Sequence, residues 1–422
     1  MSASQLSATF FLQMFVILGA CRLVGMAARR LGQPQVVGEM IAGVLLGPSL
    51  LGWMAPGLAE RIFPKESLGL LYAGSQLGVG LYMFLVGTGF ETGHFPRRAR
   101  SAVAVSVSGM VVPFLLGAAL ALWLRGEPGL FSPNATAFEA MLFLGAAMAI
   151  TAFPMLARIL HERGLSGTPL GTLALAAGAV DDAAAWCVLA IVLASFGAGA
   201  GVAVLAIAGG ALYGLILLTA GRRALARLAD AAGPTGELPA PVLAVVLMLF
   251  CLAAWITDAI GIHAVFGGFI LGVAMPRGPF IRGLRAQLEP FAVVFLLPMF
   301  FTYSGLNTRL DLVDSPRMLL IALAVLAAAI VGKGGACWAA ARATGADQRT
   351  ALAVGTLMNA RGLMELIILN IGLQHGVIQQ GLFSILVLMA VVTTLMASPM
   401  FERVYGRHHP AVPDPAPDPG PG

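Results

Sequence analysis

Charged residues are scarce in this sequence. Asp, Glu, Lys and Arg together make up 11% of the 422 residues, while hydrophobic residues make up 59%. A typical soluble domain carries about 25% charged residues. This shortage excludes an ordinary soluble fold and predicts an all-α integral membrane protein whose outer surface contacts the lipid bilayer.

Cysteine is also scarce and is never paired. The four cysteines, Cys21, Cys187, Cys251 and Cys337, stand singly in apolar runs, without the short spacings of metal or redox motifs. We therefore interpret them as small buried residues. No cofactor is expected.

Long apolar runs fill most of the chain. About thirteen of them are long enough to cross a bilayer, which takes about 20 helical residues. The runs lie near 7–28, 34–52, 67–90, 101–124, 138–160, 170–196, 199–221, 240–258, 261–276, 288–305, 318–341, 350–373 and 381–401.

Basic residues gather on alternate connections between these runs, for example at Arg29, Arg98, Arg223 and Arg282. Short cytoplasmic loops of membrane proteins are enriched in Lys and Arg. The pattern predicts a multi-pass protein of the cell (inner) membrane with its N-terminus outside and its C-terminus in the cytoplasm. The net charge of +5 is then a sign of topology, and no nucleic-acid partner is expected.

Two pairs of segments resemble each other across the chain. Residues 81–92 (LYMFLVGTGFET) match 297–308 (LPMFFTYSGLNT), and residues 37–44 match 266–273. The expected topology gives the two copies opposite directions across the membrane. Inverted repeats are typical of secondary transporters, whose binding site lies near the bilayer midplane.

We expect one membrane transport domain with six helices on either side of a linking helix. The ranges are 1–402 for the domain, 34–124 and 261–341 for the segments that contain the repeat partners, 199–221 for the linking helix, and 403–422 for a short disordered Pro-rich tail.

Ionisable residues lie deep within some apolar runs. Asp181 and Asp182 occur in GAVDDAAAW, and Lys333 occurs in IVGKGG at a similar expected depth. Such residues are costly in a bilayer and usually mark a transport pathway or pair with each other. Adjacent helical positions point about 100° apart, so one aspartate can face Lys333 while the other faces a water-filled cavity. A carboxylate can hold either a proton or a small hard cation, and competition between the two couples their fluxes.

Helix breakers accompany polar residues in two runs. Pro154 follows Thr151, and Gly362 follows Asn359. Proline removes an intrahelical hydrogen bond, and irregular backbone within a membrane normally lines a cavity. We therefore expect Thr151 and freed carbonyls to contribute to the ion-binding site, although a threonine hydroxyl can also bond to its own helix.

Three further buried charges are expected to act as gating or structural polar groups together with Asn359. Arg361 and Glu365 are four residues apart and can pair on one helical face. Glu39 is a possible third partner.

Three other functions fit the sequence less well. An intramembrane aspartyl protease needs two acids that face each other from two helices, whereas Asp181 and Asp182 are adjacent on one helix. A channel fits inverted repeats and broken helices less well than alternating access does. A sodium-coupled symporter of an organic anion would need anion-binding donors, and the deep acids disfavour it.

Five segments together resemble the monovalent cation:proton antiporter family, of the sodium/proton exchanger type. They are the aspartate pair, Lys333, TAFP (151–154), MNARGLMELIILNIG (358–372) and GQPQVVGEMIAGVLLGPSLLG (32–52).

The resemblance implies a thirteen-span fold in which two crossed, partly unwound helices belong to a core domain that moves against a dimerisation domain. Asp182 would be the principal carrier of cation and proton, Asp181 would pair with Lys333, and Thr151 would lie at the helix crossing. The function implied is exchange of a monovalent cation, Na⁺ foremost with Li⁺ or K⁺ open, for protons by an electrogenic homodimer. A potassium/proton efflux antiporter of the same family is the alternative function. The resemblance implies a long cytoplasmic domain after the membrane part of such members, and the given sequence stops shortly after the last apolar run, which disfavours this alternative.

Overall fold

The structure of the chain is a computed structural model. It describes residues 1–33, 35–89, 99–151, 156, 159–160, 165, 168–195, 199–231, 238–260 and 264–406. Pro154, the greater part of the Pro-rich tail (407–422) and the side chain of Asp182 lie outside the described residues.

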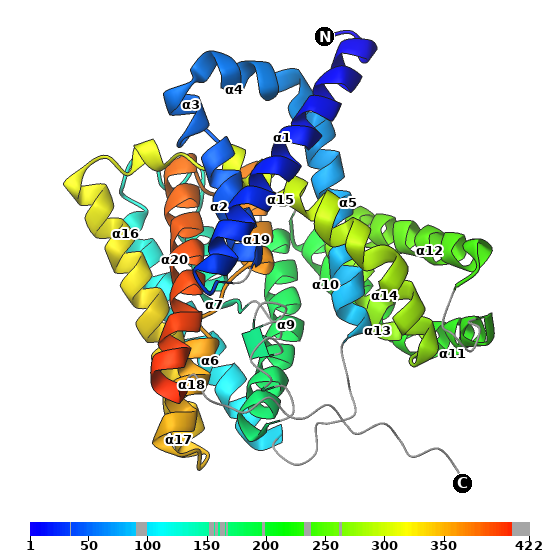
Figure 1. Cartoon of the computed structure of the whole chain (residues 1–422). Helices are drawn as coiled ribbons and strands as arrows, with labels where there is room; N and C mark the ends of the chain where they lie inside the picture. Colours follow the sequence, from blue (N-terminus) through cyan, green and yellow to red (C-terminus); the bar gives the residue numbers. More distant parts are fainter. Residues whose placement is uncertain are drawn as a thin grey trace.

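The described residues are almost entirely helical (Figure 1). In the first half the helices are α1 (Ala3–Arg30), α2 (Gln35–Leu46), α3 (Leu51–Met54), α4 (Pro56–Ile62), α5 (Leu68–Thr88), α6 (Ala99–Leu124), α7 (Ala137–Ala149), α9 (Pro169–Ser195) and α10 (Gly199–Ile216). In the second half they are α11 (Arg222–Leu225), α12 (Ala240–Ala259), α13 (Ala264–Ala274), α14 (Pro279–Phe291), α15 (Leu297–Leu306), α16 (Pro316–Ala329), α17 (Ala336–Ala343), α18 (Gln348–Leu357), α19 (Leu363–Gln374) and α20 (Gln380–Tyr405). The expected all-α architecture is confirmed.

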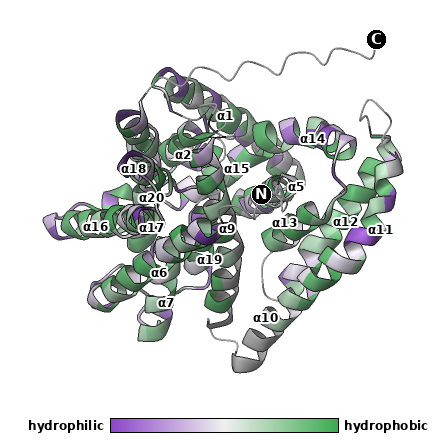
Figure 2. Ribbon diagram, turned by 90° about the horizontal axis from the view of Figure 1, so that it is seen from below, coloured by the Kyte–Doolittle hydropathy of each residue, from purple (hydrophilic) through white to green (hydrophobic). Residues whose placement is uncertain are grey.

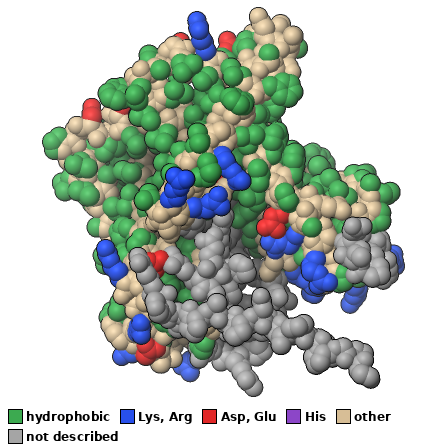
Figure 3. All heavy atoms as spheres, in the orientation of Figure 1, with side chains coloured by type: hydrophobic (Ala, Val, Ile, Leu, Met, Phe, Trp, Pro, Cys, Tyr) green, Lys and Arg blue, Asp and Glu red, His purple; other side chains and the backbone are tan. Residues whose placement is uncertain are grey.

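The outer surface is apolar, as a bilayer requires. Within the described residues, 8 helical stretches are long and apolar enough to cross a membrane. Large side chains such as Phe15, Val331 and Trp255 are at least two-thirds exposed. Figure 2 shows that hydrophobic residues predominate along most helices, and Figure 3 shows hydrophobic side chains over most of the visible surface, with basic residues mainly toward its lower part.

Two buried clusters divide the interior. The first lies mainly among α6, α7, α9 and α16 to α20, and the second mainly among α1, α12 and α14. Helices α2, α5, α13 and α15 contribute to both clusters, so they join the two groups of helices. Figure 1 shows α16, α17 and α18 of the first group on the left and α12 and α14 of the second group on the right.

The repeated segments pack in equivalent ways. Helix α2 lies against α15, and α13 lies against α5. Gly43 of α2 and Gly272 of α13 occupy matching repeat positions, and a Cβ on either would come within 2.2 Å of a carbonyl oxygen, that of Phe301 or Phe84. Only glycine permits this close approach of the two backbones.

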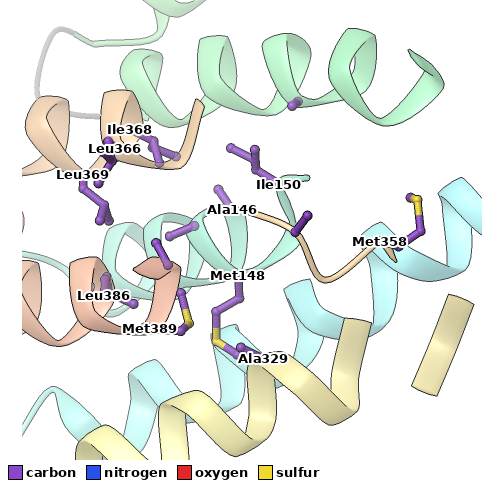
Figure 4. Close-up of a cluster of buried hydrophobic side chains, with 14 of the residues drawn as sticks. Ala146, Met148, Ile150, Ala329, Met358, Leu366, Ile368, Leu369, Leu386 and Met389 are labelled. Atoms are coloured by element: carbon purple, nitrogen blue, oxygen red, sulfur yellow. The ribbon is translucent and has the colours of Figure 1, made fainter. Parts of the chain in front are cut away.

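Several of the expected runs are interrupted helices. Helix α7 starts at a capping box formed by Thr136 and Glu139 and ends at Ala149, with Ile150 in an extended conformation. Residues 358–362 separate α18 from α19, and the π-helical stretch Ile330–Gly335 separates α16 from α17. Figure 4 shows that side chains from α7, α19 and α20 pack together where these interruptions meet.

Candidate functional site

Asp181 is the centre of a buried polar cluster. Its side chain is 1% exposed, and one carboxylate oxygen, Oδ2, accepts a hydrogen bond from the Thr151 hydroxyl at 2.5 Å and from Lys333 Nζ at 2.9 Å. The other oxygen, Oδ1, accepts a hydrogen bond from the Ser106 hydroxyl at 2.5 Å. Four separate elements therefore meet at one carboxylate.

Lys333 connects this cluster to the end of α7. It is completely buried and also donates to the carbonyl oxygen of Ala149, the last residue of α7. These contacts hold the Lys333 ammonium in the interior, so the side chain does not extend along its helix toward the membrane surface. Its π-helical stretch is a type of distortion that often occurs at functional sites.

The glycines around Lys333 let neighbouring helices approach it closely. A Cβ on Gly334 would lie 2.3 Å from Nδ2 of Asn359, and a Cβ on Gly109 of α6 would lie 2.5 Å from Sγ of Cys337. The glycines on either side of Lys333 in IVGKGG thus let α6 and α18 pack directly against the backbone of this helix.

Arg361 lies in the break between α18 and α19 and is 1% exposed. Its Nη1 and Nη2 donate to the carbonyl oxygens of Ala147 and Met148 at 2.9 and 2.8 Å. The final carbonyls of a helix lack intrahelical partners and favour cations. Arg361 and Lys333 together therefore cap the end of α7.

Arg361 also contacts Glu365, with 3.3 Å between Nη1 and Oε2. The predicted pairing occurs, but the two residues do not share a helical face, because α19 begins at Leu363, after Arg361. The backbone N–H of Arg361 donates to the Thr394 hydroxyl, which in turn donates to the Arg361 carbonyl oxygen, so α20 holds the break in place.

Asn359 lies at the start of the same break, beside a small cavity that Ile330, Thr356 and Thr393 also line. Its amide nitrogen donates to the Gly355 carbonyl oxygen at 3.3 Å. Gly362, the expected helix breaker, directly precedes α19 in an extended conformation.

Glu39 lies on α2 and is 4% exposed. One of its carboxylate oxygens accepts a hydrogen bond from Gln35 at 2.8 Å. Asp182 belongs to α9, directly after Asp181, but its side chain lies outside the described residues.

Ser106 is the member of the cluster that sequence reasoning missed. It lies on α6 within an apolar run and is 1% exposed. A single serine in such a run is a weak signal, because its hydroxyl can bond to its own helix. Only the packing of α6 against α9 shows that the Ser106 hydroxyl donates a hydrogen bond to Asp181.

Residues 15–404 match the family model described as "Sodium/hydrogen exchanger, transmembrane". The chain belongs to the sodium/hydrogen exchanger family. The match covers the aspartate pair, Lys333 and both helix interruptions, so the polar cluster lies within the family's shared domain.

Two relatives show the range of this family. The chain is 41% identical to the Na(+)/H(+) antiporter NhaS4 of Synechocystis over 398 residues, covering 92% of this chain and 95% of the relative. It is 31% identical to K(+)/H(+) antiporter 1 of Saccharomyces cerevisiae, covering 94% of this chain and 46% of the relative. The chain thus spans nearly the whole of the first relative and about half of the second.

The sodium/hydrogen exchanger fold is also found by structural comparison. The solved sodium proton antiporter MjNhaP1 from Methanocaldococcus jannaschii superposes with a TM-score of 0.61 at 14% identity, covering 94% of this chain and 96% of that chain. The predicted antiporter fold is therefore confirmed.

Proposed function

We propose that this protein is a secondary active antiporter that exchanges a monovalent cation, Na⁺ foremost, for protons. The observation that carries the proposal is the buried ion pair of Asp181 and Lys333 at the end of α7. Membership of the sodium/hydrogen exchanger family and the 41% identity to a named Na⁺/H⁺ antiporter support it.

The proposed chemistry divides the two aspartates. Asp182 carries the cation or the proton, while Asp181 is held by Lys333, Thr151 and Ser106. When a cation binds beside Asp181, it weakens the attraction between the carboxylate and the ammonium, and Lys333 can release its proton. The cation thus displaces one proton from the acid pair and one from Lys333, which gives electrogenic exchange of about two protons per cation.

The broken helices supply the other oxygen ligands. Thr151 and the carbonyls that end α7 are hard oxygen donors suited to small cations. Asn359, Arg361 and Glu365 act as structural gating groups at the second break, with Glu39 on α2 as a further polar gate residue. No resident cofactor takes part in this scheme, and no chemical transformation is catalysed.

Potassium is the second candidate substrate. The yeast relative is named a K⁺/H⁺ antiporter, and a 28% identical relative in Bacillus cereus is named a Na⁺/H⁺-K⁺ antiporter, aligned over 96% of its length. Selectivity depends on the exact placement of a few oxygen ligands, so Li⁺ and K⁺ belong in the same titration as Na⁺.

The assembly we propose is a homodimer in the cell membrane, with its N-terminus outside and its C-terminus in the cytoplasm. The alternation of basic loops supports this orientation. Exposed apolar side chains on α1, including Phe11 and Phe15, offer a surface that lipid or a second copy can cover.

The test is cation-induced dissipation of an imposed pH gradient in proteoliposomes, with Na⁺, Li⁺ and K⁺ titrated separately. Wild type is compared with Asp182→Asn and with Asp258→Asn, which changes an acid on α12, away from the site. We expect a saturable response that Asp182→Asn abolishes and Asp258→Asn leaves intact. If folded wild-type protein responds to none of the three cations, the antiporter proposal fails and a symporter on the same fold replaces it.

A further inference from the structure

Glu365 is a buried acid with almost no hydrogen-bonding support. It lies in the first turn of α19 and is 1% exposed. Neither carboxylate oxygen accepts a hydrogen bond from any residue that the structure describes. Its contact with Arg361, 3.3 Å from Nη1 to Oε2, is ionic and lacks the geometry of a hydrogen bond.

The best hydrogen bonds of Arg361 are directed elsewhere. Nη1 and Nη2 donate to Ala147 and Met148 at the end of α7, and Nε has no partner among the described residues. The Arg361 guanidinium therefore forms its hydrogen bonds with α7, although the Glu365 carboxylate lies 3.3 Å away. A bidentate pair with Glu365 would be the usual arrangement if that carboxylate were ionised.

Few other charges act on Glu365. Lys333 is the second cation that does so, and it is already paired with Asp181. Helix α7 carries Glu139 in its first turn, and α20 carries its charged residues, Glu402 and Arg403, in its last turns. An ionised carboxylate buried without donors is strongly disfavoured, whereas a protonated one is tolerated.

We propose that Glu365 is a second proton-binding site, occupied in this conformation, and that Arg361 links it to the end of α7. This inference rests on the proposed antiport function and adds a proton site apart from the aspartate pair. When Glu365 loses its proton, the new carboxylate draws the guanidinium away from the carbonyls of Ala147 and Met148. Two hard oxygen ligands then become free near Thr151, so proton release at Glu365 favours cation binding.

Infrared spectroscopy tests the protonation directly. A protonated carboxyl group has a C=O stretching band that an ionised carboxylate lacks. We expect a pH-titratable band in the wild-type protein that is missing in Glu365→Gln and retained in Glu39→Gln, the matched control at a second buried glutamate. Identical bands in wild type and Glu365→Gln at every pH would overturn the proposal.

The same comparison in an Asp182→Asn background separates this proposal from the proposed function. That variant is expected to lack transport, yet the Glu365 band should remain. If the band is present while wild type shows no exchange, the antiport proposal fails and the proton site stands; if exchange is normal and the band absent, only the proton site fails.

Thermal unfolding gives a second readout. Glutamine is a neutral replacement of nearly the same shape as a protonated glutamate, so Glu365→Gln should keep the wild-type unfolding temperature and lose one ionisation from the pH profile of exchange. A marked fall in the unfolding temperature would show that Arg361 had lost a charged partner, and this result would contradict the proposal.

Discussion

Replacing Lys333 with glutamine tests how the central ion pair is stabilised. At 2.9 Å, the Coulomb attraction is about 6 kcal/mol with an effective dielectric constant of about 20. Desolvation of each ion costs several kcal/mol, so the net contribution of the pair is small. Removing one partner nevertheless leaves a buried unpaired charge, and we expect Lys333→Gln to destabilise the protein by about 3–5 kcal/mol.

Removing the negative charge of Asp181 as well should reverse most of the destabilisation caused by Lys333→Gln. In the double variant Asp181→Asn with Lys333→Gln, no charge of the pair remains buried without its partner. The introduced asparagine can accept a hydrogen bond from one of the Ser106 and Thr151 hydroxyls through its side-chain carbonyl oxygen and donate to the other through its amide nitrogen. A double-mutant cycle of unfolding free energies in detergent measures this coupling, and we expect about 2–3 kcal/mol of recovery.

Lys65 supplies the control, because it is exposed in the short helical turn Lys65–Ser67 and is the other lysine in the chain. Lys65→Gln should leave stability unchanged. The reasoning is refuted if Lys333→Gln is as stable as wild type, or if the double variant is no more stable than the single one.

Three further predictions concern other parts of the fold. Gly109→Ala places a Cβ 2.5 Å from Sγ of Cys337, so it should cost about 1–3 kcal/mol and slow exchange, and adding Cys337→Ala should restore both in thermal-shift and transport assays. Arg317→Gln removes an ion pair with Glu127 in which the arginine side chain is 71% exposed, and the unfolding temperature should not change measurably. Asp347 caps α18, and hydrogen bonds from Thr350 and the Arg349 N–H hold the pKa of its carboxyl below its ordinary value. Its stabilising effect is therefore present above the ordinary pKa and lost as pH falls through the lowered value, so Asp347→Ala should lower the unfolding temperature at neutral pH and match wild type in strong acid.

The helical membrane architecture was predictable because hydrophobic length is a local property of the chain. Each expected apolar run contains helical residues among those that the structure describes, although several runs are not helical over their whole length. The interruptions were partly predictable, since Gly362 and Asn359 mark the break between α18 and α19. The π-helical stretch around Lys333 was not, because it depends on how α6 and α18 pack against Gly332 and Gly334.

The site was predictable only as a set of residue types. A rare charge in an apolar run is conspicuous, so Asp181, Lys333, Arg361 and Glu365 stand out in the sequence. A serine is not conspicuous, and Ser106 was missed although it is as buried as Asp181.

By itself, then, the sequence determined that the chain is a helical membrane protein with acids and bases at membrane depth, because burying charge in lipid is too costly to occur by chance. Only the tertiary structure decided which charge meets which partner. Lys333 bonds to Asp181 and Ala149, whereas Arg361 bonds to Ala147 and Met148 in preference to Glu365. The partners of these two side chains depend on the residue at which α7 ends and on which neighbouring helices reach its final carbonyl oxygens. Contacts between segments far apart in the chain determine both of these features.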